Sequence, residues 1–231
     1  TVDRGRFTVY IKNLNTSIYA IKARDLGRKG VVVGDFVELV GVDQNNPENM
    51  ARIIKVKDRR NTLSKSSDDF DSNEKILVSN VDNVAIVTST TNPEPNTRLI
   101  DRTIIASKLA GAKPFIVATK TDLKNESELT KFYEPLNIQV IPTNKTSNLN
   151  NLNIELADKT TVFVGPSGVG KSSLVNRLIP EAKRRTGNVN EVTGRGKHTS
   201  TSAYALLLND STWIIDTPGI RTFGLAHEIG R

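Results

Sequence analysis

Residues 165–173, GPSGVGKSS, have the types and spacing of a phosphate-binding loop. They fit the pattern GxxxxGK followed by serine or threonine, and they lie between an apolar run and a segment with aliphatic residues at helical spacing. A strand, a glycine loop and a helix in this order bring backbone amides to the positive end of a helix dipole, where phosphate groups bind. The stretch therefore predicts a site for a nucleoside triphosphate. The residues expected to bind it are Gly165, Pro166, Ser167, Gly168, Val169, Gly170, Lys171, Ser172 and Ser173.

Two residues of this loop would contribute directly to the chemistry. The Lys171 ammonium would reach the β and γ phosphates, which makes Lys171 a candidate catalytic residue, and the Ser172 hydroxyl would hold Mg²⁺. A glycine-rich turn that binds nothing is the alternative, but the flanking strand and helix favour the nucleotide site.

A second motif, Thr-Lys-Thr-Asp at 119–122, follows the apolar run at 114–118 and has the form of a guanine-recognition motif. Asp122 would accept hydrogen bonds from N1–H and the exocyclic amine of guanine, a pair of donors that adenine lacks. Lys120 would lay its stem along the purine plane, and Thr119 opens the motif. Its position suits this role, because open α/β sheets bind ligands at the carboxyl ends of their strands. An ATP-using P-loop enzyme stays open as an alternative.

A third motif, Asp-Thr-Pro-Gly at 216–219, follows the apolar run at 212–215. Asp216 would hold Mg²⁺ through a water molecule, and the Gly219 amide would sense the γ-phosphate. The preceding residues 193–201 are rich in glycine, basic and hydroxyl side chains, as in a switch loop from which a threonine joins the Mg²⁺ ligands. A plain flexible loop is the alternative for these residues.

The composition of the 231 residues is that of a polar globular protein, with 37% hydrophobic and 25% charged residues. The absence of cysteine excludes disulfides and thiolate metal sites and agrees with a cytoplasmic location. No apolar run is long enough to cross a bilayer, so we expect no membrane partner. The net charge of +7 favours a polyanionic partner beyond the nucleotide, although general solubility would also explain it.

Three regions are expected along the chain. Residues 1–60 contain short alternating strands and predict a small all-β barrel of the OB type, residues 61–75 form a polar linker, and residues 76–231 alternate strands and helices around a parallel sheet. The barrel is expected to contact nucleic acid, or else to serve as a structural lid. The candidate contacts are the basic residues Arg6, Lys12, Lys22, Arg24, Arg28, Lys29, Arg52 and Lys55 and the aromatic residues Phe7, Tyr10, Tyr19 and Phe36.

The motifs stand in an unusual order: base motif, phosphate loop, switch loop, then the Asp-Thr-Pro-Gly motif. Ordinary GTPases place the base motif last, and the same sheet forms if the chain is circularly permuted. With TKTD at 119–122, GPSGVGKSS at 165–173, GRGKHTST at 194–201 and DTPGIRTFGL at 216–225 behind an N-terminal barrel, the chain resembles the circularly permuted, ribosome small-subunit-dependent GTPases of bacterial 30S assembly.

The resemblance implies a P-loop NTPase sheet of circularly permuted topology and a GTP hydrolase that uses Mg²⁺ and alternates between GTP and GDP. It implies a role in late assembly of the small ribosomal subunit, with the 30S subunit and 16S rRNA as partners, and we expect a monomer. It also implies that Thr199 or Ser200 joins Ser172 in holding Mg²⁺, and that a second purine-side loop lies at Thr143, Asn144 and Lys145. The family continues into a helical zinc-binding domain, but this chain ends at Arg231 without a cysteine to ligate zinc, so that domain is expected to be truncated or absent.

Hydrolysis is expected to be slow alone and to be stimulated by the small subunit. Small GTPases orient the attacking water with a glutamine after the third motif, but here that position is Ile220. His198 is the candidate for positioning the water, as the family resemblance also suggests, and an RNA-contacting histidine is the alternative. A nucleotide-regulated RNA-binding module with negligible hydrolysis remains open as a second interpretation of the whole chain.

Overall fold

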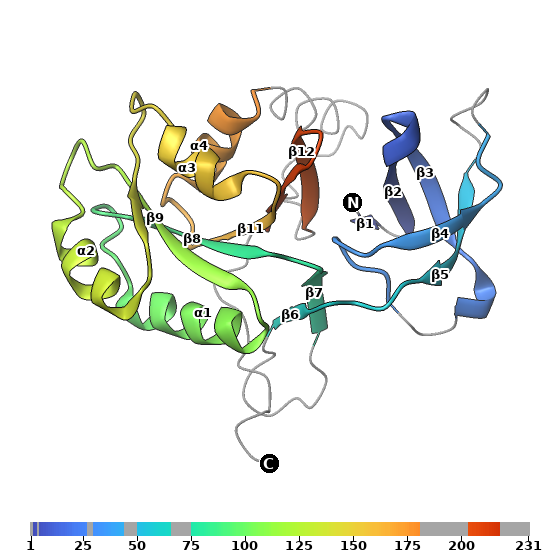
Figure 1. Cartoon of the computed structure of the whole chain (residues 1–231), viewed down its shortest axis with the longest axis horizontal. Coiled ribbons are helices and arrows are strands. Elements are labelled where there is room, and N and C mark those ends of the chain that lie inside the picture. The colour runs from blue at the N-terminus through green and yellow to red at the C-terminus, as the bar shows by residue number, and fades with distance from the viewer. Residues whose placement is uncertain are drawn as a thin grey trace, which may run out of the picture.

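The structure, a computed structural model, describes residues 2–3, 5–26, 30–43, 50–65, 75–180 and 203–217. These residues form an N-terminal five-stranded sheet and a six-stranded α/β sheet that lie side by side (Figure 1). A two-stranded ribbon, β6 (Thr62–Lys65) and β7 (Lys75–Ser79), lies where the chain passes from one sheet to the other.

The N-terminal sheet has a core of its own. We refer to it as the barrel, although its described strands form an open sheet with β1 and β4 at its two edges. Its elements are β1 (Val2–Asp3), β2 (Arg6–Ile11), η1 (Lys12–Leu14), β3 (Thr16–Lys22), η2 (Arg24–Leu26), β4 (Val37–Val40) and β5 (Ala51–Val56). The strand order is β1-β2-β3-β5-β4, with β3 and β5 parallel and the other pairs antiparallel. The core contains Phe7, Ile18, Ala20, Ala51 and Ile53, which alternate along their strands with residues on the outer face.

One expected strand of the barrel is shorter than its apolar run. Residues 31–40 are mostly apolar, but only Val37–Val40 form β4. The chain turns at Gly34, whose φ of 96° lies in the left-handed region that favours glycine. Val33, just before this turn, bridges instead to Val78 of β7.

The α/β sheet has the order β10-β9-β8-β11-β13-β12. Its elements are β8 (Asn83–Ser89), α1 (Thr97–Leu109), β9 (Lys113–Thr119), α2 (Ser127–Tyr133), η3 (Glu134–Leu136), β10 (Val140–Pro142), α3 (Asn150–Leu156), β11 (Thr160–Val164), α4 (Lys171–Leu178), β12 (Tyr204–Asn209) and β13 (Thr212–Asp216). The five strands from β10 to β13 in this order are parallel, which confirms the expected parallel sheet. The edge strand β12 is antiparallel to β13 and was not predicted.

Helices cover both faces of this sheet, with α1 and α2 on one side and α3 and α4 on the other (Figure 1). Alternate strand residues point to opposite faces, so Val84 and Ile86 of β8 pack in the cluster that includes α1, whereas Ala85 and Val87 pack in the cluster that includes α3 and α4. Burial on both faces explains why these strands are nearly continuous apolar runs in the sequence.

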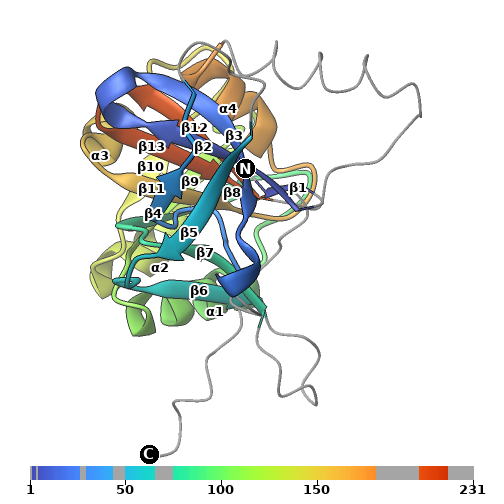
Figure 2. The same cartoon turned by 90° about the vertical axis from the view of Figure 1, so that its right-hand side faces the viewer.

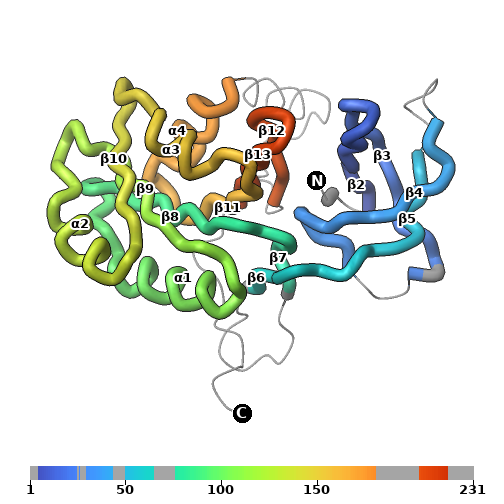
Figure 3. The backbone as a smooth tube through the Cα atoms, in the orientation of Figure 1, coloured from blue at the N-terminus to red at the C-terminus, as the bar shows by residue number. Residues whose placement is uncertain are grey.

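The expected linker at 61–75 contains ordered structure at both of its ends. Thr62–Lys65 form β6, which pairs antiparallel with Lys75–Ser79 of β7. Leu63 and Val78 are buried in the larger core of the α/β sheet, and this burial holds the ribbon in place. Figure 3 traces the chain from β5 through β6 as it leaves the barrel for the α/β sheet.

A buried carboxylate joins the barrel to this ribbon. Asp35 accepts hydrogen bonds from the Val32 amide at 2.9 Å, from the Arg59 guanidinium at 2.6 and 2.8 Å, and from the Ser79 hydroxyl at 2.7 Å. Its side chain is 1% exposed. A Cβ atom at neighbouring Gly34 would lie 2.0 Å from the Ser79 carbonyl oxygen, so no larger residue fits between the two backbones.

A second contact joins the barrel to strand β13, on the side of the α/β sheet that faces the barrel (Figure 1). The rings of Tyr10 in β2 and Trp213 in β13 meet edge to face, with their centroids 5.1 Å apart. Figure 2 shows the barrel strands lying over β12 and β13 when the molecule is viewed from the barrel side. In the described part of the chain, no helix has the length and apolar character needed to span a membrane.

Candidate functional site

The phosphate loop lies at the carboxyl end of β11 and leads directly into α4, as the sequence predicted. A Cβ atom at Gly165 would lie 2.3 Å from the Val87 carbonyl oxygen of β8, so the loop can leave β11 at this point only with glycine. Gly170, with φ of 93°, ends the loop at the N-cap of α4. The side chain of Val169 is buried beneath the loop, which anchors it to the α4 face of the sheet.

The hydroxyl-bearing residues of the loop are open to solvent. Ser167, Ser172 and Ser173 are exposed, and Pro166 is half-buried. Ser172 lies in the first turn of α4, where a hydroxyl oxygen can meet an ion carried by the bound phosphates.

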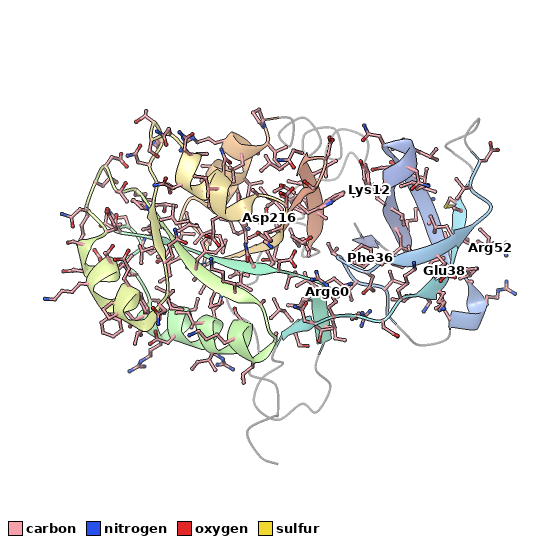
Figure 4. The ribbon with its side chains drawn as sticks, viewed as in Figure 1. Lys12, Phe36, Glu38, Arg52, Arg60 and Asp216 are labelled. Atoms are coloured by element: carbon pink, nitrogen blue, oxygen red, sulfur yellow. The ribbon has the colours of Figure 1, made fainter. Side chains whose placement is uncertain are left out.

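Lys171 and Asp216 form an ion pair at the centre of this edge of the sheet. Asp216 ends β13, the strand beside β11, and its Oδ1 accepts a hydrogen bond from the Lys171 ammonium. The two side chains are only 9% and 4% exposed. Figure 4 shows Asp216 within the α/β half of the molecule. The groups predicted to bind phosphate and Mg²⁺ therefore lie in direct contact with each other.

Tyr204 donates a hydrogen bond from its phenol to the other oxygen of Asp216, Oδ2, at 2.7 Å. Burial of the ring, followed by this hydrogen bond and the negative charge of Asp216, raises the pKa of Tyr204 well above its usual range. The sequence reasoning missed this residue. The signal was present, since Asn209-Asp210-Ser211 between two apolar runs indicates a hairpin, and that hairpin places Tyr204 opposite Asp216.

Thr217, directly after Asp216, is fully buried and donates from its hydroxyl to the Phe163 carbonyl of β11 at 2.8 Å. This bond ties the end of β13 to the strand that carries the phosphate loop. It thereby fixes the distance between the loop and the Asp216 carboxylate.

The base motif reaches the phosphate loop through two side chains. The Thr119 hydroxyl, at the end of β9, hydrogen-bonds to the Val169 carbonyl, and the Lys120 ammonium donates to the Gly168 carbonyl at 2.9 Å. Lys120 also donates to the Asn92 carbonyl, in the loop after β8. Asp122 is exposed, and within the described residues its carboxylate has no hydrogen-bond partner, so it is available to a ligand.

The second purine-side loop lies next to the base motif. The Thr121 hydroxyl donates to the Thr143 carbonyl at 3.1 Å, and the Asn144 carboxamide oxygen accepts from the amides of Thr146 and Ser147 in its own turn. Lys145 is exposed. The Asn144 side chain therefore holds the loop in shape, and its role toward a base stays a prediction.

Arg177 of α4 clamps this loop to the phosphate-binding helix. Its guanidinium donates to the backbone carbonyls of Asn144 and Ser147, about thirty residues earlier in the chain. This contact could not be predicted from the sequence, because an arginine on a helix is most often solvated. The clamp links the base side of the site to the phosphate side.

The oxygen-rich donor set at this edge fits Mg²⁺. A serine hydroxyl and a carboxylate are hard ligands, and Mg²⁺ is commonly bound by one or two carboxylates together with the phosphates of its nucleotide. In the same described ranges, no group of three or more histidine, cysteine, aspartate or glutamate side chains could hold a metal ion by itself, so Mg²⁺ here would depend on the phosphates of the nucleotide. Of the residues predicted for this site, His198, Thr199 and Gly219 fall outside the described residues, as does the rest of the switch loop, and their roles stay predictions.

The chain is similar in sequence to a well-defined family. The model of the RsgA GTPase family matches residues 56–226. The small ribosomal subunit biogenesis GTPase RsgA of Alkaliphilus metalliredigens is 34% identical over 230 residues, which cover 96% of this chain and 75% of the relative. The protein of the same name from Hahella chejuensis is 38% identical over 205 residues, covering 85% of this chain and 57% of that protein.

Two solved structures have a similar fold. YjeQ from Thermotoga maritima superposes with a TM-score of 0.68 at 26% identity, covering 94% of this chain and 72% of its own. YloQ, described as a circularly permuted GTPase, superposes with a TM-score of 0.64 at 23% identity, covering 95% of this chain and 69% of its own. These matches confirm the permuted α/β fold with its strand-rich N-terminal region.

Proposed function

The chain belongs to the RsgA GTPase family, and from that premise we propose that it binds and hydrolyses GTP in the maturation of the small ribosomal subunit. The family assignment confirms the resemblance drawn from the motifs and, with it, the GTPase class. The relatives are named for small ribosomal subunit biogenesis, which supports this role for the chain.

The observation that carries the proposal is the meeting of three separated motifs at one edge of the α/β sheet. The phosphate loop follows β11, Asp216 ends β13, and the base motif follows β9, all at the carboxyl ends of parallel strands. Because Lys120 and Thr119 touch the phosphate loop directly, a nucleotide bound there would have its base beside Asp122. A carboxylate at that position would not favour ATP, because adenine lacks the pair of hydrogen-bond donors that guanine presents to it.

The residues present support a simple division of roles. The loop amides and Lys171 would bind the phosphates, Ser172 and Asp216 would hold Mg²⁺, and Asp122 would select guanine. When bound, Mg²⁺ neutralises charge that develops on the transferring phosphoryl group. Of the residues outside the described ranges, His198 is proposed to position water and Thr199 to join the Mg²⁺ ligands, and we propose that a partner orders them.

The proposed function is tested by phosphate release from GTP, with and without isolated 30S subunits. We expect slow release by the chain alone and an increase of at least about tenfold with 30S subunits, because ordering of the water-positioning groups by a partner typically has a large effect. Isolated 50S subunits serve as the control. Tight GTP binding without turnover in either condition would favour the nucleotide-regulated RNA-binding module, and faster turnover of ATP than of GTP would favour the ATP-using enzyme.

We also propose that 16S rRNA binds the outer face of the barrel, in the cytoplasm, with the barrel and the α/β sheet acting as two domains. One row of residues crosses four strands of the barrel on its outer face. In the strand register, Arg6 of β2 is opposite Ile21 of β3, which is opposite Arg52 of β5, which in turn is opposite Val40 of β4. Tyr19, 57% exposed, lies on the same face as Ile21. Exposed arginines around an exposed ring suit phosphates and a stacked base.

Two of the aromatic side chains expected to contact nucleic acid pack against other parts of the protein instead. Phe7 lies in the barrel core at 7% exposure and cannot stack on a base, and Tyr10 packs on Trp213. Figure 4 shows Arg52 on the side of the barrel away from the α/β sheet and Phe36 on the side toward it. Arg28 and Lys29 fall outside the described residues.

Replacing Arg6 and Arg52 together with glutamine is expected to weaken 30S binding and to lower the slope of log affinity against log salt by about 1.5, because two phosphate contacts are lost. The control pair, Lys108→Gln with Lys131→Gln, removes the same charge from exposed positions on α1 and α2. An unchanged salt slope in the arginine pair, measured by subunit co-sedimentation over a salt series, would place the rRNA contact elsewhere.

A further inference from the structure

We propose that Tyr204 is a positioning residue that holds the Asp216 carboxylate ready for Mg²⁺ and so sets the Mg²⁺ concentration needed for tight nucleotide binding. This inference rests on the proposed function, because it concerns the same nucleotide site. It assigns a role to a strand, β12, that carries none of the recognised motifs.

The two oxygens of Asp216 have separate partners. Oδ1 receives the Lys171 ammonium from α4, and Oδ2 receives the Tyr204 phenol at 2.7 Å. Tyr204 and Asp216 are directly opposite each other in the β12–β13 pair, so the short distance follows from the register of the hairpin. Asp216 is 3% exposed, which leaves little solvent to replace either partner.

The two partners differ in whether a nucleotide can remove them. The β and γ phosphates compete for the Lys171 ammonium, because a phosphate-binding loop directs this lysine to them. When Lys171 turns to a phosphate, Tyr204 is the partner that remains on the carboxylate among the described side chains. Its hydrogen bond would then fix the rotation of the carboxylate and leave Oδ1 free to hold Mg²⁺ through a water molecule.

Partners that orient a metal ligand in this way commonly change metal affinity by 10- to 100-fold when they are removed. The phenol of Tyr204 donates its one hydrogen to Asp216, so that hydrogen is not available to the nucleotide, and the effect of Tyr204 should appear only when the ion is present. Loss of the phenol should therefore change the dependence on Mg²⁺ and leave nucleotide binding without Mg²⁺ nearly the same.

The experiment measures binding of fluorescent GDP, and of a fluorescent non-hydrolysable GTP analogue, to the full chain over a series of free Mg²⁺ concentrations. In Tyr204→Phe the Mg²⁺ concentration for half-maximal affinity should rise about tenfold. Affinity measured in EDTA should stay within about twofold of wild type. Tyr133→Phe is the matched control, because the buried phenol of Tyr133 donates in the same way to Asp101, at 2.9 Å, between α2 and α1.

Each outcome decides the inference. A Tyr204→Phe protein with the wild-type Mg²⁺ midpoint, or one whose affinity falls equally with and without Mg²⁺, would overturn it. If Tyr204 acts through Asp216, Tyr204→Phe should cause no further shift in an Asp216→Asn background, and an additive shift would contradict that route. A wild-type protein that binds no guanine nucleotide would overturn the proposed function and this inference together.

Discussion

Replacing Asp122 with asparagine is expected to lower the affinity for GTP by about three orders of magnitude. The carboxylate is placed to accept from two guanine donors, whereas an asparagine amide presents one acceptor and one donor, and the donor would meet the exocyclic amine of guanine. Sites built to hydrogen-bond a polar group discriminate by up to about 10⁴- to 10⁵-fold when the pairing is lost, and asparagine keeps one of the two acceptors. Because Asp122 is exposed, the substitution should leave the fold intact.

The measurement is competition of GTP, ATP and XTP against a fluorescent guanine nucleotide. XTP should compete better with Asp122→Asn than with wild type, because xanthine carries a carbonyl where guanine carries the amine. Glu128→Gln removes the same charge from an 84% exposed side chain on α2 and should change nothing. Equal GTP affinity in wild type and Asp122→Asn would show that the base binds elsewhere.

The second large effect concerns stability without nucleotide. Replacing Lys171 with methionine is expected to destabilise the nucleotide-free protein by about 3 kcal/mol, because it leaves a buried carboxylate without its cation. Tyr204 still donates to Asp216, but a neutral donor offsets only part of that cost. The free energy of unfolding, from denaturant titration followed by fluorescence, measures the change.

Lys113 provides the matched control for this experiment. Its ammonium pairs with Glu155 at 2.6 Å, but the lysine side chain is 60% exposed, so Lys113→Met should cost less than about 1 kcal/mol. The double variant Lys171→Met with Asp216→Asn should recover part of the lost stability, because the uncompensated charge is gone. Equal small losses for Lys171→Met and Lys113→Met would contradict the picture of a buried, stabilising pair.

The residues that the sequence analysis placed correctly share one property: their position follows from local pattern. The apolar runs at 114–118 and 212–215 lie in strands β9 and β13, and the phosphate loop lies between a strand and a helix, as its spacing requires. The meeting of Lys171 with Asp216 also follows, because the carboxyl ends of parallel strands lie at one edge of a sheet.

The contacts that could not be predicted are polar contacts between residues far apart in the chain, and the periodicity of the sequence does not identify their partners. Tyr204 reaches Asp216 across a hairpin, Arg177 reaches a loop formed earlier in the chain, and Asp35 bonds to Ser79. Periodicity identifies which face of an element is buried, but it does not say which polar group faces another. The buried Leu63 shows the same limit, since one apolar residue in a polar stretch gives no strand signal.

The close approach of Gly34 to Ser79 has a mechanical consequence. At this point the spacing of barrel and ribbon is set by two backbones with no room for a methyl group, and the ion pair of Asp35 with Arg59 closes the junction beside it. Because the contact is between two backbones, side-chain rotation cannot change the angle between the barrel and the ribbon. A molecule bound to the barrel would therefore lie at a fixed distance and angle from the nucleotide-binding edge of the α/β sheet.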